Sequence, residues 1–312
     1  AVVLHDAEDL VHPQELRLLE YLIGRAALVQ LPVIPRRAMR SRWVAGHYGD
    51  EFAELHGKQM VMREALGASI PSAGVGCAFA RDALQKLTIR TKGKPFDAHS
   101  LTEDYELGLN LTGGDARGIF ARLRDRDGQL VATQEFFPEK LEDAVRQKSR
   151  WIAGISLSGW DRLGWKNDWR ENWMRLRDRK ASLAAIVLAI AYAAVILTGA
   201  LLLADRFGLY KFQPVSGFLK TLLFVNAGFL MWRLLLKSYF VFALYGLREA
   251  AISIPRTIVA NVINILAAWR AIGHYVEQLA GHPVNWEKTQ HFYPETDEIQ
   301  QLRSGYSLAG RN

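Results

Sequence analysis

The sequence predicts an α/β domain followed by helices that lie on and cross a membrane. Over residues 1–160, short apolar runs with strand periodicity alternate with segments of helix periodicity, which is typical of a sheet covered by helices. After residue 160 the composition changes, and residues 181–204 contain no charged side chain. With 312 residues and 50% hydrophobic content, the chain is long enough for these two units.

Charge and cysteine content limit the class of protein. The net charge of +7 suits either a nucleic acid or an anionic membrane surface. Acidic residues are interleaved with the basic ones, which argues against a nucleic-acid-binding arm, so we expect a lipid bilayer and no nucleic acid as partner. Cys77 is the single cysteine and cannot form an internal disulfide, and we expect it to be a small buried residue.

The first predicted strand, Ala1–Leu4, is apolar throughout and is expected to be a buried central strand. It runs directly into His5-Asp6-Ala7-Glu8-Asp9, and a helix is expected from Pro13 to about Arg25. Ligand sites of open α/β sheets lie at the carboxyl ends of strands, which is where this acidic stretch falls. Because the chain opens inside a strand and without Met, we expect it to be a fragment of a longer protein.

The remaining elements of the domain follow from the same periodicities. Pro71–Gly76 is a small-residue turn whose glycines allow close approach to a sugar or phosphate, although the spacing matches no phosphate-binding loop. A loop rich in Pro and Arg is expected over Pro32–Arg42. Strands are expected at Leu28–Val33, Cys77–Ala80, Arg117–Leu123 and Leu130–Phe136, and helices at about Gly49–Leu66 and Pro138–Ile155.

Two later motifs combine residue types that suit chemistry. Residues 101–106 (LTEDYE) set three carboxylates behind Thr102 at a predicted helix start, where the helix dipole favours negative charge. The plain alternative is a capped surface helix. Gln147, Arg150 and Trp151 have i, i+3, i+4 spacing and share one helix face. The plain alternative there is an interfacial anchor beside the membrane.

Three motifs occur in order ahead of the membrane segment: an acidic pair, Thr-Glu-Asp and Gln-x-x-Arg-Trp. This combination resembles the processive family 2 glycosyltransferases, the group that includes cellulose and hyaluronan synthases. A narrower resemblance, to the bacteriophage adsorption protein B type of inner-membrane glycosyltransferase, rests on His5–Asp9, Asp50–Lys58, Pro71–Gly76, the cluster around Gln147, and Trp286–His291. The resemblance covers most of the chain and is strongest in residues 1–160.

The resemblance implies an architecture and a function. Residues 1–160 would be the C-terminal portion of a GT-A nucleotide-sugar transferase domain, whose missing first strands would hold much of the nucleotide base. Residues 161–280 would be a membrane region, and residues 281–312 a cytoplasmic tail. The implied activity is transfer of a sugar from a UDP-sugar to a growing bacterial surface glycan with inversion. An outer-membrane export or receptor partner is also implied.

Roles for individual residues are implied by the same resemblance. Asp104 would be the general base that takes the proton of the acceptor hydroxyl, a task suited to a positioned carboxylate. Thr102 and Glu103 would fix the loop and the acceptor contacts beside it. The cluster that holds the acceptor sugar and the diphosphate would be Gln147, Arg150 and Trp151, because an Arg pairs with phosphates and a Trp ring stacks on a sugar.

A divalent cation is expected at Asp6 and Glu8, because carboxylate oxygens are the ligands that Mg²⁺ or Mn²⁺ prefers. The family more usually has Asp-x-Asp at this point, so Glu8 is a departure and Asp9 is an alternative ligand. The plain reading of the same residues is an acidic turn that caps the helix at Pro13.

Membrane contact is predicted from residue 160 onward. Four tryptophans, at positions 160, 165, 169 and 173, recur among seven cations, which is typical of an amphipathic helix in a membrane interface. The cations are Arg162, Lys166, Arg170, Arg175, Arg177, Arg179 and Lys180. Residues 181–204 are expected to span the bilayer, and residues 214–236 to return. Residues 248–276 are expected to be interfacial, and whether residues 238–247 continue the second span stays open.

The cation excess ahead of the first span places residues 1–180 in the cytoplasm, because cytoplasmic segments are enriched in Lys and Arg. The expected location is therefore the bacterial inner membrane, with the catalytic portion on the cytoplasmic side. A different class of function stays possible: a non-catalytic membrane scaffold or phage-receptor assembly component that retains the fold. The presence of Asp104, Gln147, Arg150 and Trp151 favours the enzyme.

Overall fold

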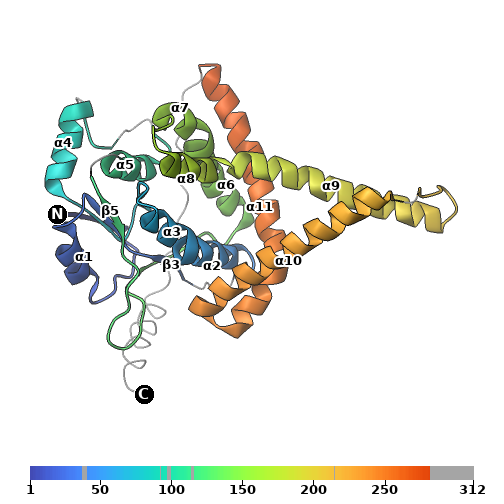
Figure 1. Ribbon diagram of the computed structural model, residues 1–312, viewed down its shortest axis with the longest axis horizontal. Coiled ribbons are helices and arrows are strands. Elements are labelled where there is room, and N and C mark those ends of the chain that lie inside the picture. The colour runs from blue at the N-terminus through green and yellow to red at the C-terminus, as the bar shows by residue number, and fades with distance from the viewer. Residues whose placement is uncertain (37–40, 92, 97–99, 114–115, 214, 282–312) are drawn as a thin grey trace.

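The computed structural model describes residues 1–281, except for residues 37–40, 92, 97–99, 114–115 and 214. An α/β domain forms one side of the molecule, and two long helices project from it while a third runs along it (Figure 1). The predicted fold class is therefore confirmed. The expected cytoplasmic tail, including His291, lies outside the described residues apart from Gly281.

The central sheet has four strands in the order β1-β4-β2-β5. They are β1 (Val2–Leu4), β4 (Cys77–Phe79), β2 (Leu28–Gln30) and β5 (Gly118–Phe120). β4 runs antiparallel to both of its neighbours, and β2 is parallel to β5. Leu4 and Gln30 both pair with Cys77, so β1 and β2 end at the same edge of the sheet, where β4 begins.

β1 is less enclosed than the sequence predicts. Val2 is 39% exposed and Val3 is 36% exposed, so the described residues do not bury β1, and the expectation that Ala1–Leu4 is a central strand stays a prediction. Among the described residues, β1 pairs with β4 alone, and this single neighbour leaves the apolar side chains of β1 partly uncovered. β4 itself lies between two strands and is buried at every residue.

The single strand expected at Leu28–Val33 is two strands in two sheets. β2 ends at Gln30, and β3 (Val33–Pro35) pairs in parallel with β6 (Thr133–Glu135) in a separate two-stranded sheet. Pro32 has no N–H to extend the ladder of β2. Its carbonyl instead accepts a hydrogen bond from the Thr133 N–H at 3.0 Å, which directs the chain towards β6.

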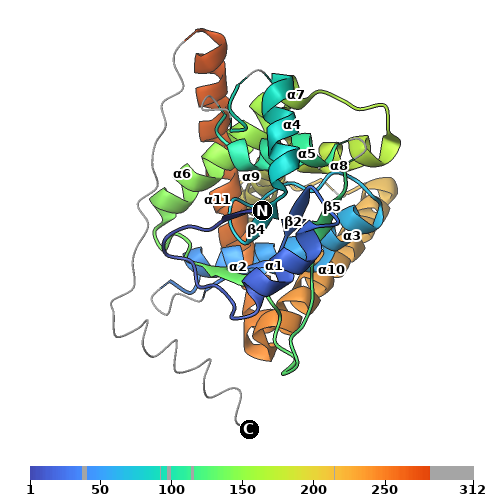
Figure 2. The same ribbon diagram turned by 90° about the vertical axis from the view of Figure 1, so that its left-hand side faces the viewer.

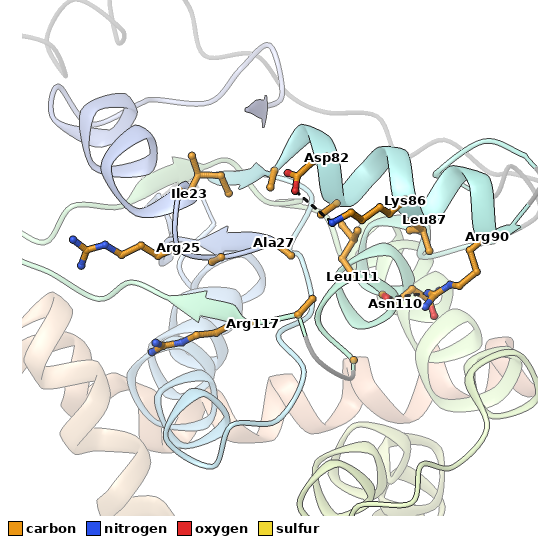
Figure 3. Close-up of a pocket in the computed structure, with 16 residues that line it drawn as sticks. Ile23, Arg25, Ala27, Asp82, Lys86, Leu87, Arg90, Asn110, Leu111 and Arg117 are labelled. Carbon is orange, nitrogen blue, oxygen red and sulfur yellow. Dashed lines mark hydrogen bonds and ion pairs between the residues drawn. The ribbon is translucent and has the colours of Figure 1, made fainter.

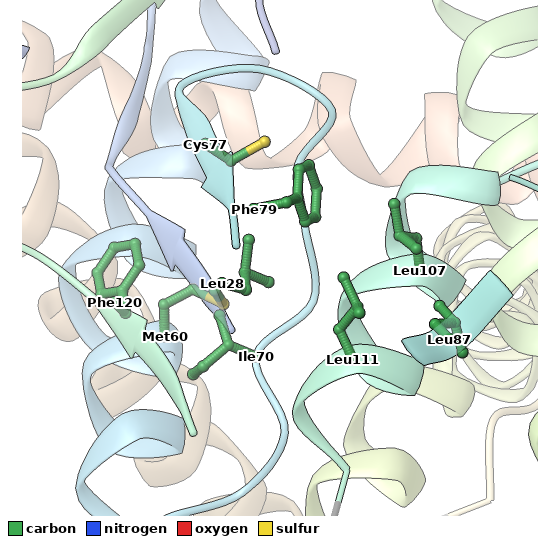
Figure 4. Close-up of a cluster of buried hydrophobic side chains, with 9 residues drawn as sticks. All are labelled: Leu28, Met60, Ile70, Cys77, Phe79, Leu87, Leu107, Leu111 and Phe120. Carbon is green, nitrogen blue, oxygen red and sulfur yellow. The ribbon is translucent and has the colours of Figure 1, made fainter. Parts of the chain in front are cut away.

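Helices cover both faces of the central sheet (Figures 1 and 2). On one face, Leu19 of α1 (Glu15–Ile23) packs with Val29 and Ala78. On the other, Leu28 and Phe79 meet side chains from α3 (Met60–Ala65), α4 (Arg81–Thr91) and α5 (Glu103–Thr112), as Figure 4 shows. Successive residues of a strand point to opposite faces, which explains why β2 and β4 are apolar at every position but Gln30.

Two expected helices contain π-helical segments. α2 (Val44–Glu54) is followed by η1 (Leu55–Gln59) before α3, and α6 (Leu141–Trp151) by η2 (Ile152–Ser158). The predictions of helices at Gly49–Leu66 and Pro138–Ile155 are thus confirmed in type, with altered boundaries. π-helical turns are rare and are often found at functional sites.

Three helices are long and apolar enough to cross a membrane. α9 (Ala181–Arg206) contains the first predicted span. α10 (Gly217–Tyr245) covers the second from residue 217 onward and continues the helix to Tyr245. α11 (Leu247–Leu279) is predicted to be interfacial, but it also qualifies by length and composition. Figure 1 shows α9 and α10 pointing away from the domain, with α11 crossing their base.

α11 has one face against the α/β domain and one face exposed. Ile263 packs with aromatic residues of α2, and Ala267 packs with the start of η2. On the outward face, Ile258 is 61% exposed and Trp269 is 81% exposed. A buried face opposite an apolar exposed face suits a helix at a membrane surface, and the interfacial assignment stays a prediction.

The stretch rich in Trp and Arg is not one amphipathic helix. It forms α7 (Gly159–Leu163) and α8 (Trp169–Arg179), separated at Gly164, where φ is +55°. Trp169 and Trp173 are exposed as expected, but Arg175 and Arg179 are buried. The Arg175 Nε donates to Glu171 Oε1 at 2.8 Å, so this cation pairs inside the protein instead of facing lipid headgroups.

Buried charges join the α/β domain to the membrane helices. Asp50 on α2 lies 3.3 Å from Lys237 Nζ on α10 and 3.5 Å from Arg256 NH1 on α11. Arg256 also donates to Glu249 Oε2 at 2.6 Å. Because unpaired buried charges are costly, these contacts fix the helices against α2.

Candidate functional site

The candidate site lies at the sheet edge where β1 and β2 end. Two segments are brought there by the strand pairing: the acidic loop (residues 5–9), which follows β1, and the Gly74 turn (residues 72–76), which precedes β4. The start of α5 lies against the Gly74 turn. Motifs far apart in the sequence therefore meet at one edge, as expected for an open α/β sheet.

Asp104 sits in the first turn of α5, against Gly74. A Cβ placed on Gly74 would lie 2.7 Å from Asp104 Oδ2, so a side chain would crowd the carboxylate. Gly74 also has a φ of +83°, which glycine adopts without strain. The Tyr105 N–H donates to Asp104 Oδ1 at 2.8 Å. The carboxylate is therefore held between the turn and the helix start.

Burial raises the pKa of Asp104 to about 6, and the nearby charge of Glu103 adds to the rise. The Tyr105 N–H and the charge of Arg150 oppose it. A pKa close to the working pH suits a general base, because the carboxylate is ionised at neutral pH and still has useful affinity for a proton.

Thr102 precedes α5 but does not cap it through its side chain. Its Oγ1 is buried without a hydrogen-bond partner among the described residues, and the side chain packs directly against Gly154 of η2. Glu103 is half-buried, and Glu106 is buried and accepts from Ser100 Oγ at 2.7 Å. The plain alternative of a capped surface helix is therefore wrong.

α6 carries the third motif. Arg150 lies near enough to Asp104 for its charge to lower the pKa of that carboxyl group. Gln147 is 2% exposed, and its Oε1 has no hydrogen-bond partner among the described residues. An unsatisfied buried amide oxygen is unusual in a folded protein and marks a position that a ligand donor would satisfy.

Trp151 is half-buried in an aromatic cluster. Its ring centroid lies 6.0 Å from that of Tyr48 and 6.4 Å from those of Phe52 and Phe137. Its neighbour Lys148 points elsewhere and pairs with Glu51 of α2. Trp151 is thus inside the α/β domain and not at a membrane surface, so the plain alternative of an interfacial anchor is wrong for it.

The acidic loop is shaped by its own backbone contacts. Asp6 is exposed and Glu8 is half-buried, whereas the Asp9 side chain has no exposed surface. Asp9 Oδ2 accepts from the Asp6 N–H at 2.9 Å and lies 3.4 Å from His5 Nδ1. Asp9 therefore serves the shape of the loop, and it is a weaker candidate ligand than Asp6 or Glu8.

A buried network ties this loop to α1 and β6. His5 Nε2 lies 3.2 Å from Oε1 of Glu15, which is fully buried. The same oxygen accepts from the Thr133 hydroxyl at 2.8 Å. Hydrogen bonds to Asp9 and Glu15 raise the pKa of His5 to about 9, so the imidazole is a cation at neutral pH. The network therefore anchors the acidic loop to α1 and β6 on its buried side.

Glu135, at the end of β6, is absent from the sequence motifs. Burial raises its pKa well above the ordinary value, and the charges of Asp9, Asp6 and Glu8 add to the rise, followed by that of Asp104. Carboxylates of both motifs therefore surround one region of negative potential. The parallel pairing of β6 with β3 brings Glu135 there, and no local sequence pattern signals that pairing.

The donor set fits a hard divalent cation in type. No group of three His, Cys, Asp or Glu side chains converges closely enough to hold a metal by itself within the described residues. Mg²⁺ commonly keeps several waters and uses one or two carboxylates together with substrate phosphates. Asp6 and Glu8 match that pattern in type, because both carboxylates belong to one short loop, Asp6 is exposed, and the loop lies in a region of negative potential.

A pocket of about 660 Å³ lies elsewhere, at the opposite edge of the sheet (Figure 3). It is lined by the starts of β2 and β5 and by α4. Its cationic side chains already have protein partners: Lys86 lies 3.9 Å from Asp82, Arg117 lies 3.3 Å from Glu64, and Arg90 donates to a backbone carbonyl. Because it lies at the opposite edge of the sheet, the pocket is separate from the candidate site.

Comparisons with known proteins agree with this arrangement. The family model described as glycosyl transferase family group 2 matches residues 1–272. Bacteriophage adsorption protein B of Escherichia coli K12 is 36% identical over 96% of this chain, and so is bacteriophage N4 adsorption protein B of Escherichia coli O157:H7. The chain spans 43% of the length of each. This chain belongs to glycosyl transferase family group 2.

Proposed function

We propose that the protein is an inner-membrane glycosyltransferase that moves a sugar from a UDP-sugar to a growing bacterial surface glycan with inversion. The observation that carries the proposal is the position of Asp104, a carboxylate with a raised pKa that lies against Gly74 and near Arg150. Family membership supplies the reaction class. The relatives are named for phage adsorption, so a surface glycan or its outer-membrane export partner is the proposed point of phage contact.

In the proposed reaction, an acceptor hydroxyl attacks the anomeric carbon of the donor sugar. Asp104 takes the hydroxyl proton, a glycosidic bond forms, and the bond from the anomeric carbon to the diphosphate breaks. The electron pair of that bond leaves with UDP. One direct displacement inverts the anomeric centre, and the leaving diphosphate accumulates negative charge that positive groups stabilise.

The side chains around Asp104 supply the remaining functions. Arg150 would pair with the diphosphate, as guanidinium groups do in bidentate fashion. Gln147 offers a buried amide to a substrate hydroxyl, and the exposed part of Trp151 offers an apolar surface for a sugar face. Thr102 and Glu103 hold the acceptor side through the start of α5.

Asp6 and Glu8 are the proposed ligands of Mg²⁺ or Mn²⁺. A bound divalent cation would neutralise charge on the leaving diphosphate. The network through Asp9, His5 and Glu15 keeps the loop shaped for that task.

The activity test is a screen of UDP-sugars with membranes that contain the full-length protein, with release of UDP as the readout. Turnover with at least one donor, lost in Asp104→Asn, is the expected result. Release of UDP at the same rate by the parent and by Asp104→Asn would refute the assignment of the base. Absence of turnover with every donor would favour a non-catalytic role.

The proposed orientation places the α/β domain in the cytoplasm and residues 207–213 in the periplasm. Cys77 is fully buried and is unsuitable as an accessibility probe, so it is replaced by Ser. In that background, Gly208→Cys should react with an impermeant thiol reagent from the periplasmic side, and Asp127→Cys on the exposed 125–129 turn should not. Labelling of both from one side would contradict the two-span hairpin.

A further inference from the structure

Gln30 is a fully buried polar side chain that points from the end of β2 into the Gly74 turn. Its Nε2 donates to the Leu31 and Val75 carbonyls, both at 2.9 Å, and its Oε1 accepts from the Ala73 N–H at 2.8 Å. Gln30 is 0% exposed. One side chain thus binds both limbs of the turn. The turn is also held by the Leu31 N–H, which donates to the Gly76 carbonyl at 2.9 Å, and by the Gly74 N–H, which donates to Ser72 Oγ at 3.1 Å.

The Gly74 turn lies between two parts of the candidate site. On one side, Gly74 meets the Asp104 carboxylate directly. On the other, Val75 is buried in the aromatic cluster against which Ala73 and Trp151 pack. A displacement of the turn would therefore move the wall beside Asp104 and disturb the packing of Trp151.

A purely structural role would also explain a buried glutamine, because buried polar groups need partners. That role predicts a loss of stability when Gln30 is changed and nothing more. A positioning role predicts, in addition, a change in the environment of Asp104. The two roles differ in a measurable property, the titration of one carboxyl group.

We propose that Gln30 is a positioning residue for the transfer reaction: it fixes the Gly74 turn as the wall that encloses the Asp104 carboxylate. The proposal rests on the assignment of Asp104 as the base. Loosening the wall admits water to Asp104. Because burial is the largest cause of the raised pKa, hydration lowers the pKa from about 6 towards its ordinary value of 3.8.

The charged and titratable groups that face Asp104 come from several elements. They are Glu103 on α5, Arg150 on α6, Glu135 on β6 and Cys77 on β4. None of them is altered in the test variants. A shift in the Asp104 titration therefore reports the enclosure of the carboxylate and not a changed neighbouring charge.

The first measurement needs no substrate. Asp104→Asn mimics the protonated acid, so the melting temperatures of the parent and of Asp104→Asn are compared between pH 4 and pH 8. The pKa of Asp104 is higher in the folded protein than in the unfolded chain, so protonation stabilises the folded state. This stabilisation is fully present below the unfolded pKa and is lost as the pH rises through about 6. The parent should lose melting temperature relative to Asp104→Asn over that window.

The same comparison is then made in a Gln30→Met background, in which the side chain keeps its length but loses every side-chain hydrogen bond. Gln30→Asn is the second variant if Gln30→Met does not fold, since it is neutral and too short to reach both limbs. In this background, we expect the pH range over which the parent loses melting temperature relative to Asp104→Asn to move down by about one pH unit. The matched control is Thr112→Val, which removes a buried side-chain hydrogen bond to the Ile70 N–H at the opposite end of α5.

Turnover gives the second readout. With an accepted UDP-sugar, the Gln30 variants should show kcat lowered about tenfold or more, with the KM for the donor changed much less, because misplacement of a reacting group acts on the chemical step. An unmoved titration window in both Gln30 variants would overturn the inference. A moved window in a protein that turns over no UDP-sugar would support the enclosure by Gln30 while refuting the proposed function.

Discussion

The two halves of the candidate site are built differently. The Asp104 half is enclosed: the carboxylate lies against a glycine turn, Thr102 and Tyr105 on either side of Glu103 and Asp104 are buried, and Gln147 of α6 is 2% exposed. The acidic loop is more open: Asp6 is exposed, and His5 and Glu15 support the loop on its buried side. The contrast fits the proposed roles, in which Asp104 is a fixed base and Asp6 and Glu8 would complete the coordination of a cation together with the phosphates of the donor.

The largest effect is expected from the enclosed half. Asp104→Asn keeps the size of the side chain and removes the base, and the loss of general-base catalysis costs about 10²–10⁴ in rate. Release of UDP measures the rate, and donor binding should survive. Asp82→Asn makes the same change in the first turn of α4, where the side chain is 75% exposed, and should leave turnover unchanged.

A smaller effect is expected from the wall beside the base. In Gly74→Ala the added Cβ would lie 2.7 Å from Asp104 Oδ2, so the carboxylate must move. A misplacement of about 1 Å can cost about 10² in rate. The matched control is Gly67→Ala, which adds the same strain at a φ of +69° with nothing within 4 Å of the new Cβ. Equal kcat losses in the two variants would show that backbone strain, and not contact with Asp104, is responsible.

The acidic loop should respond through its affinity for the metal. Glu15→Gln weakens the contact to His5. His5 in turn contacts Asp9, whose carboxylate accepts from the Asp6 N–H. Loss of such a supporting contact typically weakens metal binding about 10–100-fold. The affinity for Mn²⁺ is measured by titration, with the electron paramagnetic resonance signal of the free ion as the readout. Glu20→Gln on the exposed face of α1 is the control, and equal affinities of all three proteins would contradict the role of the network.

The sequence predicted the fold and the three motifs because both depend on local patterns. Alternating periodicities located the strands and helices, and a charge-free run located α9. What it could not predict depends on long-range packing. Arg175 was expected at a membrane surface, and its burial depends on the fold of α8 against the domain. Gln30 is the one polar residue of β2, and Glu135 ends the polar strand β6, and only strand pairing shows which segments they meet.

The central claim is that Asp104 is a base whose pKa is raised by its enclosure. The most direct test is the pH dependence of kcat/KM for UDP release, measured from pH 4.5 to pH 8.5 in the parent and in Asp104→Asn. Because the ionised carboxylate is the active form, the parental rate should fall as the pH drops through about 6, and the residual rate of Asp104→Asn should show no such limb. A parental profile that stays level through pH 6, or the same limb in both proteins, would contradict the account.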